Sequence, residues 1–340
     1  MKTVSMRDVA QVAGVSLATV SYVVNQGPKP VSAEMRERVL RAMGELGYQG
    51  RRRGRSRSRP LTVGAIVPDA TNSFFSQALA GVEATLRERG HLLLVGSSDE
   101  DPVRELELVT ALTRGRAAGL ILTPCTSVPR EVERLAAGGL PVTLMDREDG
   151  ETTLNRVVMD NYQSAFRATR LLAESGYRRI ALINGPEHIT PARDRLRGYR
   201  DALQLAELSV ASAYVRLGPF TFDHGRQSTL DLLSLSNRPE AIFSSSAILT
   251  TGVLAALRER RLHWPEDIAI VGFGDAAWAS LVTPTLTVIE QPARQLGEVA
   301  ARLLLATEAG PGSGQRVVLD SHLVLRESHW RPARVLEGGR

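Results

Sequence analysis

The first 25 residues carry the pattern that most restricts how this chain can fold. Ser5 and Asp8 form a capping box of the Ser-x-x-Asp type, which predicts a helix that starts near Met6. Gly14 can adopt the left-handed backbone that stops this helix, and Ser16 then caps a second one. Two short helices joined by a tight turn are typical of proteins that lay the second helix in the major groove of DNA.

A third helix completes this N-terminal module. Prolines 28 and 30 follow the second helix, and Ser32 is placed to cap the third. The residues up to about 47 therefore predict a small helical bundle, which buries little apolar surface and is only marginally stable alone. The apolar stripe expected on the third helix consists of Val39, Leu40, Met43 and Leu46.

Charge separates this module from the rest of the chain. Residues 1–60 contain twelve Lys+Arg and four Asp+Glu, a net charge of +8, whereas the remaining residues have a net charge of −3. A basic head on a nearly neutral body indicates a polyanionic partner for the head alone.

The composition narrows the class of protein. The 340 residues suffice for two or three domains, and 43% hydrophobic with 23% charged residues is typical of a folded globular chain. Cys125 is the single cysteine and the N-terminus has no apolar signal segment, so we expect a cytoplasmic protein. The apolar runs are too short to span a membrane, so we do not expect a membrane among the partners. No Cys/His cluster, phosphate loop or nucleophile motif is present, so we expect no metal, no cofactor and no catalytic residues.

The body from 61 to 335 alternates apolar strand patterns with amphipathic helices. One set of strands begins at Thr62–Val67, and a second set begins after Asp160. Such alternation predicts parallel, doubly wound sheets. Two similar α/β lobes of this kind bind ligands in the cleft between them, at the carboxyl ends of the strands.

Specific strings link the head and the body to one family. The head contains DVA-x-x-AGVS-x-x-TVS-x-V-x-N within residues 4–48, and the body contains GAIVPD-x-x-N-x-FF from Gly64, R-x-x-GY from Arg195, VGF from Val271 and TVI-x-QP from Thr287. The chain resembles the lactose/galactose repressor (LacI/GalR) family of transcriptional regulators. The resemblance implies an all-α helix-turn-helix headpiece and a core like that of periplasmic sugar-binding proteins.

The resemblance also implies where the domains divide. The headpiece would span 1–48, an Arg-rich hinge 49–60, the core 61–335 and a tail 336–340. Three crossovers would build an N-lobe from 61–160 plus 290–320 and a C-lobe from 161–289 plus 321–335.

Position by position, the resemblance assigns DNA contacts to the headpiece. Leu17 and Ala18 stand where the family reads base edges, and two apolar side chains there suit thymine methyl groups. Tyr22 replaces an arginine that many members have, so a guanine preference at that step is not expected. The expected headpiece contacts are Ser5, Ser16, Leu17, Ala18, Thr19, Ser21, Tyr22 and Asn25.

The hinge departs from the family pattern. The family has a Pro-Asn-x-x-Ala-Arg-x-Leu helix here, whereas this chain has six arginines in nine positions from Arg51 to Arg59, with Gly54 among them. Glycine and clustered like charges disfavour a helix. Two alternatives remain: an extended arm in a narrow, A·T-rich minor groove, or a flexible linker that contacts phosphates only. The residues concerned are Arg51, Arg53, Arg55 and Arg57.

The resemblance assigns an effector site to the body. Ser246-Ala247 and Gly274 replace residues that supply carboxylate and amide groups in the family, so an unmodified sugar is disfavoured. Arg147, Arg193 and Arg195 would favour an anionic ligand. Alternatively, Phe74 and Phe75 pack in the core and Arg195 forms an interlobe salt bridge. The expected effector contacts are Asn72, Phe74, Phe75, Asp146, Arg195, Phe220, Ser246, Asp275 and Gln291.

Together, these expectations describe a transcriptional regulator that acts as a repressor and binds a pseudo-palindromic operator as a homodimer. A small-molecule effector in the cleft, anionic or sugar-derived, would modulate its affinity for DNA. The alternatives are a solute-binding protein without a role on DNA, and a regulator whose core no longer binds an effector. Asp146, Asp160 and Asp275 lack the accompanying groups that an enzyme would need.

Overall fold

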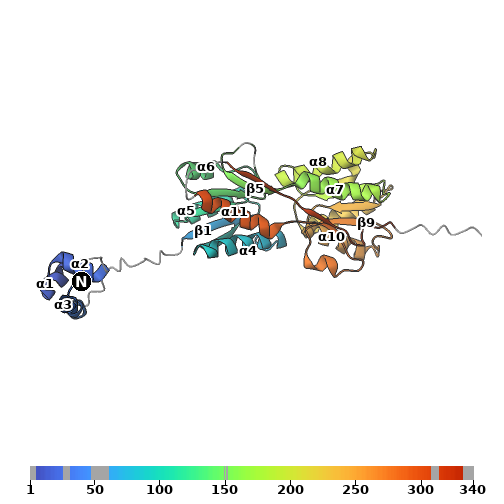
Figure 1. Ribbon diagram of the computed structural model, residues 1–340. Coiled ribbons are helices and arrows are strands. Elements are labelled where there is room, and N and C mark those ends of the chain that lie inside the picture. The colour runs from blue at the N-terminus through green and yellow to red at the C-terminus, as the bar shows by residue number, and fades with distance from the viewer. Residues whose placement is uncertain are drawn as a thin grey trace, which may run out of the picture. The chain divides into compact units, whose positions relative to one another are not determined.

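A computed structural model of the chain describes residues 5–25, 31–46, 61–148, 150, 152–307 and 314–331 (Figure 1). The chain divides into two compact units, Met1–Leu61 and Thr62–Arg340. The predicted Arg-rich hinge, 49–60, and the predicted tail, 336–340, lie outside the described residues.

The first unit is the expected bundle of three helices, α1 (Met6–Ala13), α2 (Leu17–Asn25) and α3 (Ala33–Glu45). The capping box is present, because the Ser5 backbone N–H donates to Asp8 at 2.7 Å while Ser5 Oγ accepts from the Asp8 N–H. Gly14 has a φ of 63°, the left-handed conformation that ends α1. The buried core consists of Val9, Ala10, Ala13, Val20, Val23, Val39 and Ala42.

The N-lobe is built on a six-stranded sheet in the order β11-β5-β4-β3-β1-β2, with every pairing parallel. Helices α4 and α11 cover one face, where their side chains pack with those of β1 and β5. Helices α5 and α6 cover the other face. The bounds are β1 (Thr62–Val67), α4 (Ser73–Glu88), β2 (Leu92–Ser97), α5 (Pro102–Arg114), β3 (Gly119–Leu122), α6 (Arg130–Ala137), β4 (Val142–Met145), β5 (Asn155–Met159), α11 (Ala293–Thr307) and β11 (Arg316–Leu319).

The C-lobe repeats this design in the order β12-β10-β9-β8-β6-β7, with β12 antiparallel to β10. Helices α7 and α8 cover one face of its sheet, and α9 and α10 cover the other. The bounds are α7 (Asn161–Glu174), β6 (Ile180–Asn184), α8 (Thr190–Leu205), η1 (Ser212–Tyr214), β7 (Val215–Leu217), α9 (Phe222–Leu233), β8 (Ala241–Ser244), α10 (Ala247–Glu259), β9 (Ala269–Phe273), η2 (Ala277–Ser280), β10 (Thr287–Glu290) and β12 (His322–Val324).

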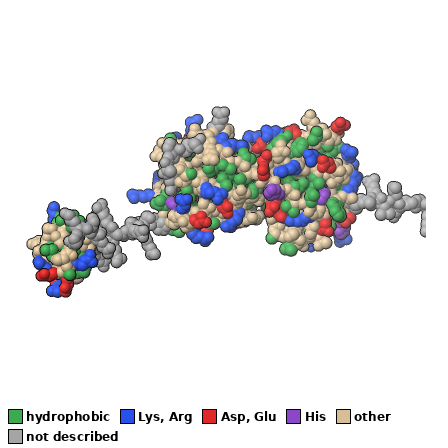
Figure 2. Space-filling model, in the orientation of Figure 1, with side chains coloured by type: hydrophobic (Ala, Val, Ile, Leu, Met, Phe, Trp, Pro, Cys, Tyr) green, Lys and Arg blue, Asp and Glu red, His purple; other side chains and the backbone are tan. Residues whose placement is uncertain are grey.

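The chain passes between the lobes three times, after β5, after β10 and between β11 and β12. As a result α11, late in the sequence, lies against α4 of the N-lobe (Figure 1). Strand β10 extends to Glu290, one residue beyond the boundary expected from the sequence. Acidic and basic side chains are intermingled over the face of this unit that Figure 2 shows, in keeping with its small net charge.

Candidate functional site

The first turn of α2 lies on the surface of the headpiece. Ser16 Oγ accepts the backbone N–H of Thr19 at 3.1 Å and therefore caps this helix. Leu17 is 45% exposed and Ala18 is also exposed, whereas Val20 is fully buried. The exposed part of the Leu17 side chain is available for a partner. Thr19, Ser21 and Tyr22 are half-buried. The structure does not describe the side chain of Asn25.

Helix α3 supports the turn that precedes α2. Arg38 Nη2 donates to the carbonyl of Ala13 at 2.7 Å and to that of Gly14 at 3.2 Å. These carbonyls are at the C-terminal end of α1, where a cation is favourable and the backbone acceptors lack partners within the helix. Arg38 thereby fixes the turn from which α2 begins, a role that its place in the sequence did not reveal.

The second site is a cavity of about 350 Å³ between the lobes of the core. Residues after the carboxyl ends of β1 and β4 line its N-lobe wall, and residues after β8 and β9 line its C-lobe wall. This is the edge at which parallel sheets bind ligands. All nine residues expected to contact an effector line this one cavity, namely Asn72, Phe74, Phe75, Asp146, Arg195, Phe220, Ser246, Asp275 and Gln291.

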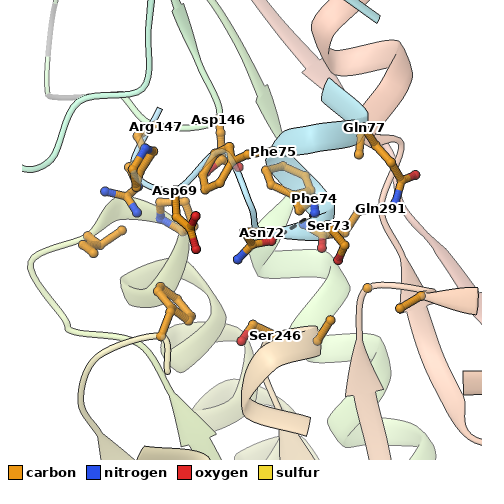
Figure 3. Close-up of a pocket in the computed structure, with 18 of the residues that line it drawn as sticks. Asp69, Asn72, Ser73, Phe74, Phe75, Gln77, Asp146, Arg147, Ser246 and Gln291 are labelled. Carbon is orange, nitrogen blue, oxygen red and sulfur yellow. Dashed lines mark hydrogen bonds between the residues drawn. The ribbon is translucent and has the colours of Figure 1, made fainter. Parts of the chain in front are cut away.

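The N-lobe wall is polar and partly aromatic. Figure 3 shows Asp69, Asn72 and Ser73 on one side of the cavity, with Ser246 across from them. Asn72 caps α4 by accepting the backbone N–H of Phe74 at 3.0 Å, so its amide nitrogen is left for a ligand. Phe74 and Phe75 meet edge to face, with ring centroids 5.1 Å apart. Phe75 belongs to the core, as the alternative interpretation held, yet both rings also border the cavity.

Asp146 is the most unusual side chain in the cavity. It is 6% exposed, and its Oδ1 has no hydrogen-bond partner in the described structure. Its φ of 68° is a left-handed conformation that a residue with a side chain seldom adopts. Burial raises the pKa of Asp146, although the charges of Arg147 and Arg195 act in the opposite direction. A buried acceptor without a partner costs free energy, which a ligand hydroxyl group would recover.

The two arginines beside Asp146 are engaged by the protein. Arg147 donates to both carboxylate oxygens of Glu100, at 2.6 and 2.8 Å, and to the carbonyl of Pro124. Arg147 lies beside the cleft as expected, but its charge is balanced by Glu100, which the fold brings to it from a separate loop. Arg193 is exposed and absent from the lining, so its expected place beside the cleft is wrong.

Arg195 is held within the C-lobe. It is 5% exposed, and it donates to Asn161 Oδ1 at 2.9 Å and to the carbonyl of Ser245 at 2.6 Å. Its guanidinium lies 3.9 Å from the centroid of the Phe273 ring. Burial lowers the pKa of Arg195 to about 10, so it remains charged at neutral pH. Both hydrogen-bond partners belong to the C-lobe, so the alternative of an interlobe salt bridge is not what the described residues show.

The C-lobe wall has smaller and less polar groups. Ser246 caps α10, and Asp275 forms an ion pair with Arg326 at 2.8 Å. Gly274 has a φ of 92° and lies beside Ala247 and Gln291. Asp160 caps α7 by accepting the Gln163 N–H.

Sequence reasoning missed several lining residues. Asp69 is the second residue after β1, a position at which a ligand contact can be anticipated, whereas Ser73, Gln77 and Glu100 gave no comparable signal.

Within the described residues no group of three His, Cys, Asp or Glu side chains is arranged to hold a metal ion, and none of the helices has the length and apolarity needed to span a membrane. Cys125 is buried, which raises the pKa of its thiol to about 12.

Known proteins share both parts of this arrangement. Residues 5–50 match the profile of bacterial regulatory proteins of the lacI family, and residues 169–329 match a periplasmic binding protein-like domain. The ribose operon repressor of Escherichia coli is 36% identical over 308 residues, which cover 88% of this chain and 92% of that protein. The transcriptional repressor CytR of the same organism is 34% identical over 329 residues, covering 95% and 96%.

Solved structures agree in fold. A complex of the transcriptional regulator CelR with cellobiose is 31% identical, with a TM-score of 0.73 over 96% of this chain and 99% of that one. The lac repressor dimer bound to operator and the anti-inducer ONPF is 27% identical, with a TM-score of 0.73 over 97% and 100%. The likeness therefore extends over the helical unit and both lobes.

Proposed function

The chain belongs to the lacI family of bacterial regulatory proteins, and from that membership we propose how it works. It is a sequence-specific DNA-binding repressor whose affinity for its operator is set by a small molecule in the interlobe cavity. The observation that carries this function is the presence, in one chain, of an exposed recognition-helix start at Leu17 and a cavity containing the unpartnered carboxylate oxygen of Asp146.

We propose that the headpiece reads its operator through the first turn of α2. The exposed side chains of Leu17 and Ala18 would contact thymine methyl groups, and Ser16 with the N-terminal amides of α2 would contact a phosphate. Ser5, Thr19, Ser21, Tyr22 and Asn25 complete the proposed headpiece set. Arg51, Arg53, Arg55 and Arg57 add contacts in the hinge, either in the minor groove or to phosphates alone.

We propose that the chain acts as a homodimer on a pseudo-palindrome in the cytoplasm, where bacterial DNA is found. Both sheets end in an edge strand with exposed apolar side chains, Leu92 and Leu94 on β2 and Leu217 on β7. Pairing two copies along these edges would cover them, which natural edge strands require. The lac repressor, a similar structure, is a dimer on its operator. A dimer would place two recognition helices on successive half-sites.

The ligand that fits the cavity best is a neutral, hydroxylated molecule of the sugar class. Asp69, Asp99, Glu100 and Asp146 line the N-lobe side, and carboxylates accept hydrogen bonds from hydroxyl groups. Arg147 is neutralised by Glu100, so the anionic ligand favoured by the sequence loses its main attraction. The ribose operon repressor and the CelR–cellobiose complex are sugar-linked relatives.

Ligand binding would act through the angle between the lobes. A molecule that contacts both walls favours one interlobe angle over another, and the N-lobe directly follows the hinge to the headpiece. The relatives are repressors rather than enzymes. The headpiece argues against a pure solute-binding protein, and the formed cavity argues against a core that has lost its effector.

Selection of DNA duplexes from a random pool tests this function. The full chain should enrich one pseudo-palindromic sequence, and protection from cleavage should cover two half-sites. Recovery of unrelated sequences would contradict the proposal.

A further inference from the structure

We infer that the core carries a DNA-contact surface of its own, at the edge of the N-lobe sheet where the chain arrives from the headpiece. This surface, which we call the basic edge, consists of Arg89, Arg114 and Arg116 and binds phosphates of the operator. The inference rests on the proposed function, because it assigns a further part of the chain to the DNA that the headpiece binds.

Strand register places the basic edge around the point at which the chain enters the core. Strand β1 is the first element of the core and lies between β2 and β3 in the N-lobe sheet. Thr62 pairs with Leu92 of β2, and the Ala118 N–H donates to the Thr62 carbonyl at 2.7 Å just before β3 begins. Arg89 is three residues before Leu92, and Arg116 is two residues before Ala118. Neighbouring strands are about 5 Å apart, so the turns with these arginines flank the start of β1.

The arginines of the basic edge belong to helix ends on both faces of the sheet. Arg89 is the C-cap of α4, and Arg114 is the last residue of α5, which ends two residues before Arg116. Helices α4 and α5 cover opposite faces of the sheet. All three arginines are exposed, and none of their side chains has a hydrogen-bond or ion-pair partner among the described residues. Their charges are therefore available to a partner.

The basic edge differs in charge from the rest of the core. The turns 88–91 and 114–117 contain three arginines and one glutamate, whereas the residues after 60 together have a net charge of −3. The opposite edge of the same sheet borders the cavity and carries Asp69, Asp99, Glu100 and Asp146. The C-terminal dipoles of α4 and α5 attract cations, but this effect falls off within the last turn, and Arg116 lies beyond the end of α5. A positive edge on an acidic body matches a polyanionic partner.

The polyanion that fits is the DNA held by the headpiece. The chain between Leu46 and Thr62 has 15 residues, which span at most about 50 Å when fully extended. An operator bound by the headpiece is thus tethered near the basic edge, and its effective concentration there is high. Arginine side chains bind phosphates without reading the base sequence, so the basic edge adds affinity rather than specificity.

The salt dependence of DNA binding tests this surface. When Arg89, Arg114 and Arg116 are all replaced by glutamine, the full chain should bind its best-selected duplex about tenfold more weakly at about 0.15 M salt. The slope of log affinity against log salt concentration should become shallower by about one or more, because each lost phosphate contact removes about 0.9. A scrambled duplex should lose affinity by the same factor, since contacts to phosphates carry no sequence information.

The matched control replaces Arg258, Arg260 and Arg261 with glutamine. These arginines are also exposed and lie at the C-terminal end of α10 in the C-lobe, so the control removes the same charge from a comparable helix end. It should leave affinity and slope nearly unchanged. Arg89→Gln alone, which should lower the slope by up to about 0.9, provides a second measurement if the triple variant unfolds.

Two results would overturn the inference. One is an unchanged slope in the triple variant, and the other is an equal loss of affinity in the triple variant and the control. In either case the unaltered chain still distinguishes the selected duplex from the scrambled one through its headpiece, and the proposed function is retained. An unaltered chain that does not distinguish the two duplexes would contradict the proposed function together with this inference.

Discussion

Arg147 donates one hydrogen bond to each carboxylate oxygen of Glu100, at 2.6 and 2.8 Å, and this pair determines the charge that the cavity offers to a ligand. The side chain of Arg147 is 6% exposed, so little water competes for its guanidinium. With Glu100 in place the arginine is neutralised, and the cavity favours uncharged molecules.

Replacing Glu100 should therefore alter which ligands bind. In Glu100→Gln the cation of Arg147 is no longer balanced, and we expect ribose 5-phosphate to bind about fivefold more tightly than to the unaltered protein, equivalent to about 1 kcal/mol. Calorimetry at low salt measures this change. Glu107→Gln removes the same charge at an exposed site on α5 and should have no effect. Equal phosphate affinity in all three proteins would show that the pair does not set the charge preference.

Asp146 should make ligand binding depend on pH. Burial raises the pKa of its carboxyl group in the free protein, with Arg147 and Arg195 opposing and Glu100 adding to the shift. A ligand hydroxyl that donates to Oδ1 favours the ionised form, so affinity should fall as the pH drops through this raised pKa. Calorimetry over a pH series measures the effect. Asp146→Asn should bind about tenfold more weakly at neutral pH and lose the pH dependence; a variant that keeps the same pH profile would refute this role.

Arg38 should matter for DNA binding although it is not expected to contact DNA. Arg38→Ala removes the hydrogen bonds to Ala13 and Gly14 and should lower the stability of the headpiece by about 1 kcal/mol. Because Arg38 acts by positioning α2, the variant should bind operator more weakly, and addition of operator should raise its melting temperature less than that of the unaltered protein. Arg41→Ala, which removes an exposed arginine paired with Glu37, is the control. Equal stability of both variants would show that Arg38 does not hold the turn.

Leu17 should be sensitive to thymine methyl groups. Operators in which uracil replaces the contacted thymine lack one methyl group, and we expect about fourfold weaker binding, because a buried methylene contributes about 0.8 kcal/mol. Competition binding with single thymine-to-uracil changes measures this. In Leu17→Ala the difference between thymine and uracil should nearly vanish at one position of the half-site. Unchanged discrimination would place Leu17 away from the base edges.

The hinge arginines distinguish the two hinge interpretations. Replacing Arg53 and Arg55 with alanine should weaken binding more on operators with A·T-rich centres than on G·C-rich ones, if the arm lies in a narrow minor groove. Affinities for two operators that differ only at the centre measure this. Equal losses on both operators would leave contacts to phosphates as the only role.

Local signals made the headpiece predictable from the sequence. The Ser5–Asp8 capping box and the turn at Gly14 depend on neighbours three or four residues away, and the structure has both. The alternating strands and helices likewise predicted two mainly parallel sheets, because most strands are marked by an apolar run in their own sequence.

The charge of the cavity could not be predicted in this way. Arg147 and Glu100 are 47 positions apart and meet only when β2 and β4 are placed in one sheet. The ion pair of Asp275 could not be predicted either, because its partner Arg326 follows the last crossover between the lobes. The sequence identified nine of the residues that line the cavity, but not which of the charges there the protein itself neutralises.

The most direct test of the account is the affinity of the full chain for its best-selected duplex and for a scrambled duplex at about 0.15 M salt, with and without the sugar that binds the chain most tightly. We predict that the selected duplex binds at least about a thousandfold more tightly than the scrambled one, and that the sugar changes this ratio by about fivefold or more. Equal affinity for the two duplexes would contradict the account at its centre. Specific binding that no cavity ligand alters would contradict the coupling between the two sites.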